Sequence, residues 1–238
     1  MNESFIEQHY NNNILKNKIV SDELHIGGRK ATEYLLAALG LHQGQNVLDV
    51  GSGLGAAARA AAELYGVSVT GLELVEGLCE EARRITEEKG LTGLCDFIQG
   101  SALDMPFKDS SYDAAFMLHV NMNVQNKIKL FNEISRVLKP NSLFGFYEIL
   151  ADIHVESMVY PCPWSSLAEH SFLITPDRLE EIIESAGFVI EAKERRYDFA
   201  VSMMQRAVED QPRPAFVNLL KNIQQQRCCP WQYVCRKK

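Results

Sequence analysis

The chain has 238 residues, 46% hydrophobic and 23% charged, values typical of one soluble globular domain. Its formal net charge of -7 argues against a nucleic-acid partner, because phosphate backbones attract basic proteins. The N-terminal sequence MNESFIEQHYNNN lacks the regions of a secretory signal, and no run reaches the roughly 18 apolar residues of a membrane helix, so we expect a cytoplasmic protein with no membrane partner.

Apolar runs typical of strands alternate with helical patterns, which favours an α/β fold with a mostly parallel sheet covered by helices. The predicted strands are Asn46–Val50, Val67–Glu73, Cys95–Gln99, Tyr112–His119, Ser142–Ile149, Phe188–Arg196 and Trp231–Arg236. The predicted helices are Leu54–Tyr65, Glu76–Lys89, Val124–Leu138, one that starts at Thr175-Pro176-Asp177 and ends before Gly187, and a helical tail broken by Pro212 and Pro214. Seven strands with this alternation predict a doubly wound sheet.

Two segments lie outside this alternation. Residues 1–42 are mostly helical and precede the sheet, and residues 151–174 form an unusually long connection that contains Pro161, Pro163 and Trp164. Long connections in compact domains are commonly functional. We therefore expect a helical lid and a substrate-covering insert within a single domain over residues 1–238, acting as a monomer or a homodimer.

The six cysteines contain no C-x-x-C pair and no regular spacing. We expect free thiols in a reducing compartment and no metal site. The adjacent pair Cys228-Cys229 has no partner in the sequence pattern that would give it a metal-binding role.

The sequence VLDVGSGLG at residues 47–55 is an apolar strand that runs into a glycine-rich turn and then a helix. Glycines let the backbone approach a ligand closely, and the carboxyl ends of parallel strands are where such sheets bind ligands. Gly51, Gly53 and Ala56 also satisfy the dinucleotide fingerprint, so a nicotinamide-dependent oxidoreductase is an alternative. Asp49 inside the strand favours a ligand with a cationic amino group and no phosphate. Glu73, at the end of the next strand, suits two ribose hydroxyls of either cofactor.

Four segments resemble, in order and spacing, the successive motifs of class I S-adenosylmethionine-dependent methyltransferases: VLDVGSGLG, VTGLELV, GSALDMPFKDSSYDAAFMLHV and EISRVLKPNSLFGFYEI. The resemblance covers residues 30–150 and extends to about 190 through SFLITPDRLEEIIESAGF. It is closest to the small-molecule branch with sarcosine/dimethylglycine, phosphoethanolamine and quinone-biosynthesis methyltransferases. It implies a Rossmann-like fold and methyl transfer from S-adenosylmethionine to nitrogen or oxygen of a small molecule, with S-adenosylhomocysteine as product.

The resemblance also implies the cofactor contacts. Asp49 and the loop residues Gly51, Ser52, Gly53 and Gly55 would hold the methionine part, Glu73 and Leu74 the ribose, Ser101 and Ala102 the adenine, and Leu118 and His119 would lie beside the methyl group. Ser101 stands where the family often has aspartate, and its hydroxyl keeps a hydrogen-bonding group there. The leader DELHIGGRKAT resembles the N-terminal lid of that branch, whose His25 would contact the cofactor or the acceptor.

A sulfonium methyl is already electrophilic, so the protein has to align the reactants and remove a proton from an amine or hydroxyl acceptor. We expect His119 to be this base, with packing against the cofactor as the alternative role. Asn121, Asn123, Tyr147 and Trp164 are the expected acceptor contacts. Asn123 has a competing interpretation as the cap of a helix beginning at Val124. Of Tyr147 and Glu148, one is expected to point into the pocket and the other into the helix layer.

Two further alternatives remain at this point. One is a non-catalytic module that binds S-adenosylmethionine, because the glycine loop and Glu73 predict binding and not turnover. The other is an enzyme that methylates protein or nucleic acid. The acidic charge argues against nucleic acid, and the sequence after the fourth strand, Leu118-His119-Val120-Asn121, lacks the N/D-P-P-Y/F tetrapeptide common in enzymes that methylate nucleic-acid amino groups.

Overall fold

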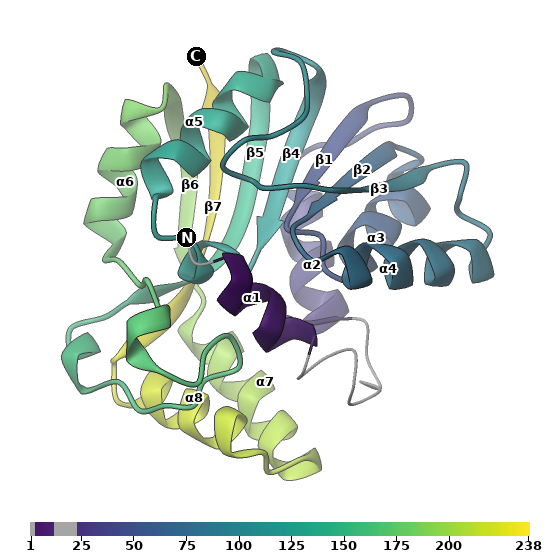
Figure 1. Cartoon of the computed structure of the whole chain (residues 1–238). Helices are drawn as coiled ribbons and strands as arrows, with labels where there is room; N and C mark the ends of the chain where they lie inside the picture. Colours follow the sequence, from purple (N-terminus) through teal and green to yellow (C-terminus); the bar gives the residue numbers. More distant parts are fainter. Residues whose placement is uncertain (1–2, 12–22) are drawn as a thin grey trace.

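Seven strands form one sheet in the order β3-β2-β1-β4-β5-β7-β6 in the computed structural model, which describes residues 3–11 and 23–238 (Figure 1). The strands are β1 (Asn46–Val50), β2 (Ser68–Glu73), β3 (Cys95–Gln99), β4 (Tyr112–Leu118), β5 (Leu138–Ala151), β6 (Phe188–Arg195) and β7 (Cys228–Lys237). Pairing among β1 to β5 is parallel, and β7 runs antiparallel to both β5 and β6. The predicted α/β fold with a doubly wound, mostly parallel sheet is confirmed.

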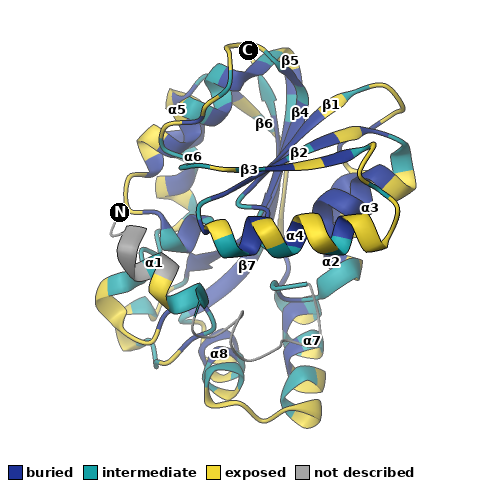
Figure 2. Ribbon diagram, turned by 45° about the vertical axis from the view of Figure 1, so that its right-hand side comes forward, coloured by how far each residue is buried: buried dark blue, intermediate teal, exposed yellow. Residues whose placement is uncertain are grey.

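Helices cover both faces of the sheet, and Figure 2 shows the strands buried between helices whose outer faces are exposed. One layer packs α2 (Gly28–Ala37), α3 (Ala56–Tyr65), α7 (Tyr197–Asp210) and α8 (Pro214–Gln224) against the sheet, and the other packs α5 (Lys127–Val137) and α6 (Pro176–Ser185). α4 (Glu76–Glu88) lies beside β2 and β3. Successive strand residues alternate between the layers, so Val47 joins the first core cluster while Leu48 and Val50 join the second. The apolar spacing of the sequence thus sets the two layers.

Several element boundaries follow the local signals in the sequence. Thr175 caps α6, because its Oγ1 accepts a hydrogen bond from the Arg178 amide, and Pro176 is the first helical residue. Asn141, with φ of 65°, takes the left-handed conformation within the Lys-Pro-Asn-Ser turn. β7 begins at Cys228, earlier than the predicted start at Trp231, because residues 228–230 pair with the end of β5.

The helix expected from Val124 begins at Lys127, and residues 121–123 form a short 3-10 helix, η2. The N-terminal cap of α5 is Asn126, whose Oδ1 accepts a hydrogen bond from the Lys129 amide at 3.0 Å. The interpretation of Asn123 as a helix cap is therefore wrong. Capping needs the side chain one residue before the first helical turn, and only Asn126 stands there.

The predicted lid contains α1 (Glu3–Tyr10) and the turn that precedes α2, while its residues 12–22 lie outside the described residues. Figure 1 shows α1 beside the carboxyl ends of the strands. The insert at 151–174 contains two 3-10 helices, η3 (Val155–Ser157) and η4 (Ala168–His170). The Nε2 atom of His9 lies 3.1 Å from the carbonyl oxygen of Pro163, so α1 contacts the insert. Lid and insert meet above the same edge of the sheet.

All six cysteines are buried and none forms a disulfide. Burial raises the pKa of every one of these thiols, to about 11 at Cys79 and about 12 at Cys162. Within residues 3–11 and 23–238, no three His, Cys, Asp or Glu side chains are grouped as metal ligands. No helix in the same ranges has the length and apolar character needed to cross a membrane.

Candidate functional site

The loop between β1 and α3 is built on glycines in left-handed conformations. Gly51 and Gly55 have φ of 73° and 76°. A Cβ at Gly51 would lie 2.4 Å from a Val120 methyl carbon, and one at Gly55 would lie 2.4 Å from the ring of Phe97. Glycine is required at both positions for two reasons: the positive φ angle, and the lack of space for a Cβ atom. The loop is thereby drawn close to β3 and to the segment after β4.

A cavity opens at the carboxyl ends of β1, β2 and β4. The space within it and in its open mouth together is about 970 Å³. It lies where the strand order changes direction between β1 and β4, the place at which doubly wound sheets bind ligands. The predicted site residues that line it are His25, Asp49, Gly51, Ser52, Gly53, Glu73, Leu74, Ser101, Ala102, Leu118, His119 and Asn123. Predicted residues from five separate segments therefore meet in one cavity.

Four predicted residues do not line this cavity. Gly55 lies behind the loop against Phe97. Trp164 is buried in the core cluster of the insert, where its Nε1 donates a hydrogen bond to Ser171 at 2.9 Å. Asn121, in η2, and Tyr147, which pairs with Leu118 at the end of β4, are buried and do not line the cavity.

The loop after β4 is held by Glu148, which accepts hydrogen bonds from the amides of Val120 at 2.9 Å and Asn121 at 3.0 Å. Burial raises the pKa of this carboxyl to about 8. Lys127 closes the same loop by donating to two carbonyl oxygens, including that of Asn121 at 2.8 Å. Neither Glu148 nor Tyr147 lines the cavity, so the expectation that one of them would is wrong. The carboxyl group of Glu148 is instead hydrogen-bonded to two backbone amides, and the ring of Tyr147 packs against that of His119.

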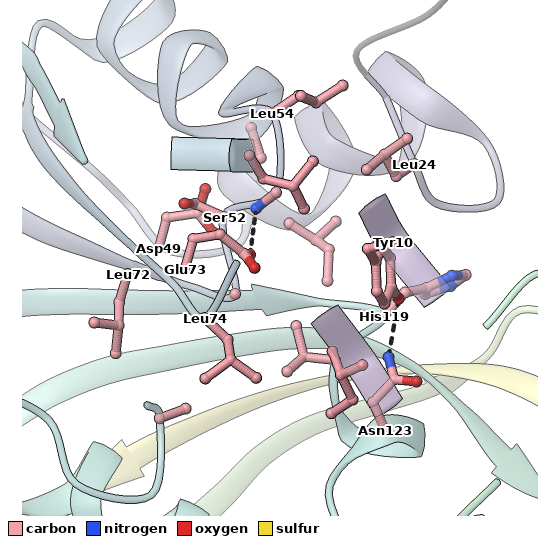
Figure 3. A pocket seen from close by; sticks show the side chains of 18 of the residues that line it. Tyr10, Leu24, Asp49, Ser52, Leu54, Leu72, Glu73, Leu74, His119 and Asn123 are labelled. Atoms are coloured by element: carbon pink, nitrogen blue, oxygen red, sulfur yellow. Dashed lines mark hydrogen bonds between the residues drawn. The ribbon is translucent and has the colours of Figure 1, made fainter. Parts of the chain in front are cut away.

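Two buried carboxyl groups, Asp49 and Glu73, lie at one end of the cavity (Figure 3). Burial, together with the charge of Glu73, raises the pKa of Asp49 to about 8. Its Oδ2 atom has no hydrogen-bond partner among the described residues. Burial also raises the pKa of Glu73, although its two oxygens accept hydrogen bonds from the amides of Gly53 and Val75, each at 2.9 Å.

The charge of these carboxyl groups determines what ligand this end of the cavity stabilises. No Lys or Arg side chain lines the cavity in the described part of the chain. Arg59, which does not line the cavity, is the cation that acts on Asp49 from behind. A cationic ligand would add a counter-charge on the cavity side and a partner for Oδ2, whereas a pyrophosphate would add repulsion to an already unfavourable pair. The residues present fit a ligand that carries positive charge.

His119 directly follows β4 and has φ of 54°, an uncommon conformation for a residue other than glycine. Its amide donates to the Tyr147 carbonyl at 2.9 Å, and its ring lies in a row between those of His25 and Tyr147, at centroid distances of 5.9 and 5.1 Å. The buried Nε2 atom has no partner within the described ranges. Burial and the neighbouring His25 lower the pKa of His119 well below 6.5, so the imidazole is neutral at pH 7.

His25 belongs to the turn that precedes α2. Its Nε2 lies 3.2 Å from the Gly28 carbonyl oxygen and 3.0 Å from Thr32 Oγ1. Burial lowers its pKa to about 4, so this imidazole is also neutral at pH 7. The lid turn thus presents an uncharged ring to the cavity beside His119.

Tyr10 of α1 is a cavity residue that the sequence reasoning missed. Its hydroxyl accepts a hydrogen bond from the Asn123 side-chain amide at 3.1 Å. Figure 3 shows its ring between Leu24 and Asn123, on the opposite side of the cavity from Asp49. Burial raises the pKa of this hydroxyl to about 12, so it is protonated. The i, i+4 spacing of Ile6 and Tyr10, both of which line the cavity, is the signal that would have indicated an inward helix face.

Comparisons with known proteins agree with this arrangement. The family model described as a methyltransferase domain matches residues 48–146. A sterol 24-C-methyltransferase of Gibberella zeae is 38% identical over 122 residues, which cover 51% of this chain and 32% of that protein. The chain spans about a third of the length of the first curated relatives it matches.

Two solved structures share the fold over nearly the whole chain. A geranyl diphosphate C-methyltransferase of Streptomyces coelicolor superposes with a TM-score of 0.85 at 15% identity, covering 99% of this chain and 98% of that one. A phosphoethanolamine N-methyltransferase of Haemonchus contortus superposes with a TM-score of 0.78 at 19% identity, covering 99% and 56%. At these identities the likeness establishes the fold and leaves the substrate open.

Proposed function

We propose that this chain is a class I S-adenosylmethionine-dependent methyltransferase, which its domain match and its fold support, and that it transfers a methyl group from S-adenosylmethionine to a small-molecule acceptor. The observation that carries the proposal is the Asp49–Glu73 carboxyl pair, buried at one end of a cavity that no described Lys or Arg side chain lines. S-adenosylmethionine carries a sulfonium and an ammonium group, and it has no phosphate.

The cofactor contacts follow from the cavity lining. Asp49, with its unpartnered Oδ2, and the loop from Gly51 to Gly53 would hold the methionine end. The oxygens of Glu73 accept backbone hydrogen bonds from Gly53, Leu74 and Val75, and a carboxylate has acceptor sites left for a ribose hydroxyl. Ser101 and Ala102 would flank the adenine. The two solved structures contain S-adenosylhomocysteine and S-adenosylmethionine respectively, which supports the same cofactor here.

The chain's own residues have two tasks in this reaction. When bound, the cofactor supplies an electrophilic methyl group, so the lid residue Leu24 serves to exclude water. His119 presents a neutral imidazole whose Nε2 is free to accept a proton from the acceptor. The neutral state matters because a protonated imidazole could not act as a base.

The alternatives differ in what they bind. A nicotinamide-dependent oxidoreductase would have to place a pyrophosphate beside two carboxyl groups, which the geometry disfavours. A non-catalytic module would bind S-adenosylmethionine as tightly as an enzyme would and transfer nothing. Binding and turnover must therefore be measured separately.

The first experiment is calorimetric titration of the purified protein with S-adenosylmethionine, S-adenosylhomocysteine and NAD. We expect the first two to bind and NAD not to bind. Methyl-labelled S-adenosylmethionine is then incubated with a cell extract split into small-molecule and macromolecular fractions. Label in the small-molecule fraction supports the proposal, label only in macromolecules contradicts the substrate class, and binding without label supports the non-catalytic alternative.

We also propose that residues 1–238 behave as a single domain, as a cytoplasmic monomer or homodimer. One cooperative unfolding transition in calorimetry and a single species in light scattering after size exclusion are the expected results. Two separate transitions would contradict the single-domain proposal.

A further inference from the structure

Charge is distributed unevenly over the cavity. Among the lining residues that the structure describes, the acidic side chains are Asp49 and Glu73, both at the cofactor end. Figure 3 shows Tyr10, Leu24, His119 and Asn123 at the other end, and the ring of the lining residue His25 lies 5.9 Å from that of His119. Both histidines there are neutral at pH 7, since burial lowers the pKa of each. The acceptor end therefore offers no fixed charge of either sign.

The charged groups just behind that end already have neighbours within the protein, and the Glu23 carboxylate lies 3.6 Å from Nε2 of His25. Glu148 accepts two backbone amides, and Lys127 donates to backbone carbonyls of the same loop. The guanidinium of Arg196 is stacked over Tyr34, 3.9 Å from the ring centroid, and donates to Gln232. A carboxylate, phosphate or ammonium group placed at this end would lose its water without gaining an ionic partner among the side chains that line it, which is unfavourable.

The protein itself places a phenol at this end. The ring of Tyr10 lies between Leu24 and Asn123, and its hydroxyl accepts a hydrogen bond from the Asn123 amide. The site thus has both the shape for an aromatic ring and the donor for its hydroxyl. The unpartnered Nε2 of His119 lines the same end and remains available as an acceptor.

We propose that the methyl acceptor is an uncharged, largely apolar molecule with a phenol-type hydroxyl, which takes the place that the Tyr10 ring occupies in this structure. This inference rests on the proposed function. The acceptor hydroxyl is held by Asn123 and lies closer to His119 than the Tyr10 hydroxyl, which makes no hydrogen bond with Nε2 of that residue, so that its proton can pass to His119. Zwitterionic amino acids and phosphorylated acceptors are excluded because they find no counter-charge at this end.

The step balances with these groups alone. A bond forms between the acceptor oxygen and the methyl carbon as the carbon–sulfur bond breaks, and its electron pair stays on sulfur, which becomes the neutral thioether. The hydroxyl proton passes to Nε2 of His119 in its Nδ1–H tautomer and then to solvent. A hydroxyl suits this weak base, because its oxygen becomes strongly acidic only while the new bond forms. An ammonium acceptor would have to lose its proton before it attacks.

The test uses three probes with one ring: 4-ethylphenol, tyramine and 4-ethylphenyl phosphate. S-adenosylhomocysteine is titrated first, and each probe is then titrated into the saturated complex. We expect 4-ethylphenol to bind at least tenfold more tightly than either charged probe, and label from S-adenosylmethionine to appear in it as an aryl methyl ether. Equal or tighter binding of a charged probe, no saturable binding of 4-ethylphenol, or label on a ring carbon would overturn the inference. Failure of S-adenosylhomocysteine to bind would instead remove the proposed function, and the inference with it.

A charge swap locates the probe. Asn123→Asp places a carboxylate at the acceptor end and should reduce the preference for 4-ethylphenol over tyramine by at least about tenfold. Asn126→Asp makes the same change on the same loop, outside the cavity lining, and keeps a good helix cap, so the preference should stay as in the unmodified chain. An unchanged preference in Asn123→Asp would show that the probe binds elsewhere. Thermal unfolding of both variants checks that they fold, and the probe panel on the unmodified chain is decisive without them.

Discussion

Replacing Asp49 with asparagine is expected to stabilise the cofactor-free protein in a pH-dependent way. In the folded chain the pKa of Asp49 is raised from its ordinary 3.8 to about 8 by burial and by the charge of Glu73. Between these two values the folded protein holds a proton that the unfolded chain releases. Its contribution to stability is therefore complete below pH 4 and falls by about 1.4 kcal/mol per pH unit as the pH rises toward 8.

The asparagine variant lacks this titration. Its free energy of unfolding should thus exceed that of the unmodified protein by an amount that grows by about 2–4 kcal/mol between pH 5 and pH 8. Urea unfolding at pH 5, 6.5 and 8 measures the difference directly. An equal dependence on pH in both proteins would refute the reasoning, because Asp49 would then ionise normally in the folded state.

The same variant should lose S-adenosylmethionine affinity by about 1.5–3 kcal/mol, the scale for hydrogen bonds to a charged group. A gain in stability coupled to a loss of binding would show that the carboxyl is kept for the ligand at the expense of the fold. Calorimetric titration at pH 8 gives the affinity. Unchanged affinity would contradict the placement of the cofactor.

Gly55→Ala should lower the free energy of unfolding by about 1–3 kcal/mol, because the added Cβ would clash with Phe97. A Cβ at Gly93 meets nothing within 4 Å, so Gly93→Ala should change the free energy of unfolding little. Equal effects of the two substitutions in urea unfolding would contradict the clash. His119→Ala should reduce kcat at least about tenfold while S-adenosylmethionine affinity changes less, and unchanged turnover with the identified acceptor would exclude His119 as the base. Glu73→Gln should weaken S-adenosylmethionine binding by about 1–3 kcal/mol, and unchanged calorimetric affinity would exclude it as the ribose ligand.

The sequence was most informative where local chemistry decides the structure. The glycine loop after β1 and the Thr175 cap were predictable because each depends on residues adjacent in the chain. The strand end at Glu73 was predictable for the same reason. Cavity residues that belong to these motifs were therefore found from the sequence.

Prediction failed where tertiary contacts decide. Strand alternation could not show that the carboxyl group of Glu148, on β5, would accept hydrogen bonds from the backbone amides of the loop after the neighbouring strand β4. Asn123 and Asn126 are equivalent as caps until the start of α5 is known. Tyr10 reaches Asn123 across more than a hundred residues, a contact that no local pattern encodes.

The burial of all six cysteines makes this chain a convenient host for site-directed spectroscopy. Thiolates are the reactive form, and burial both hides these thiols and raises the pKa of each. A cysteine introduced at the exposed Gln8 of α1 would be the one accessible to a maleimide fluorophore. Its emission, measured as the proposed acceptor is added, would test whether Tyr10 leaves the cavity, with no need to remove the native thiols.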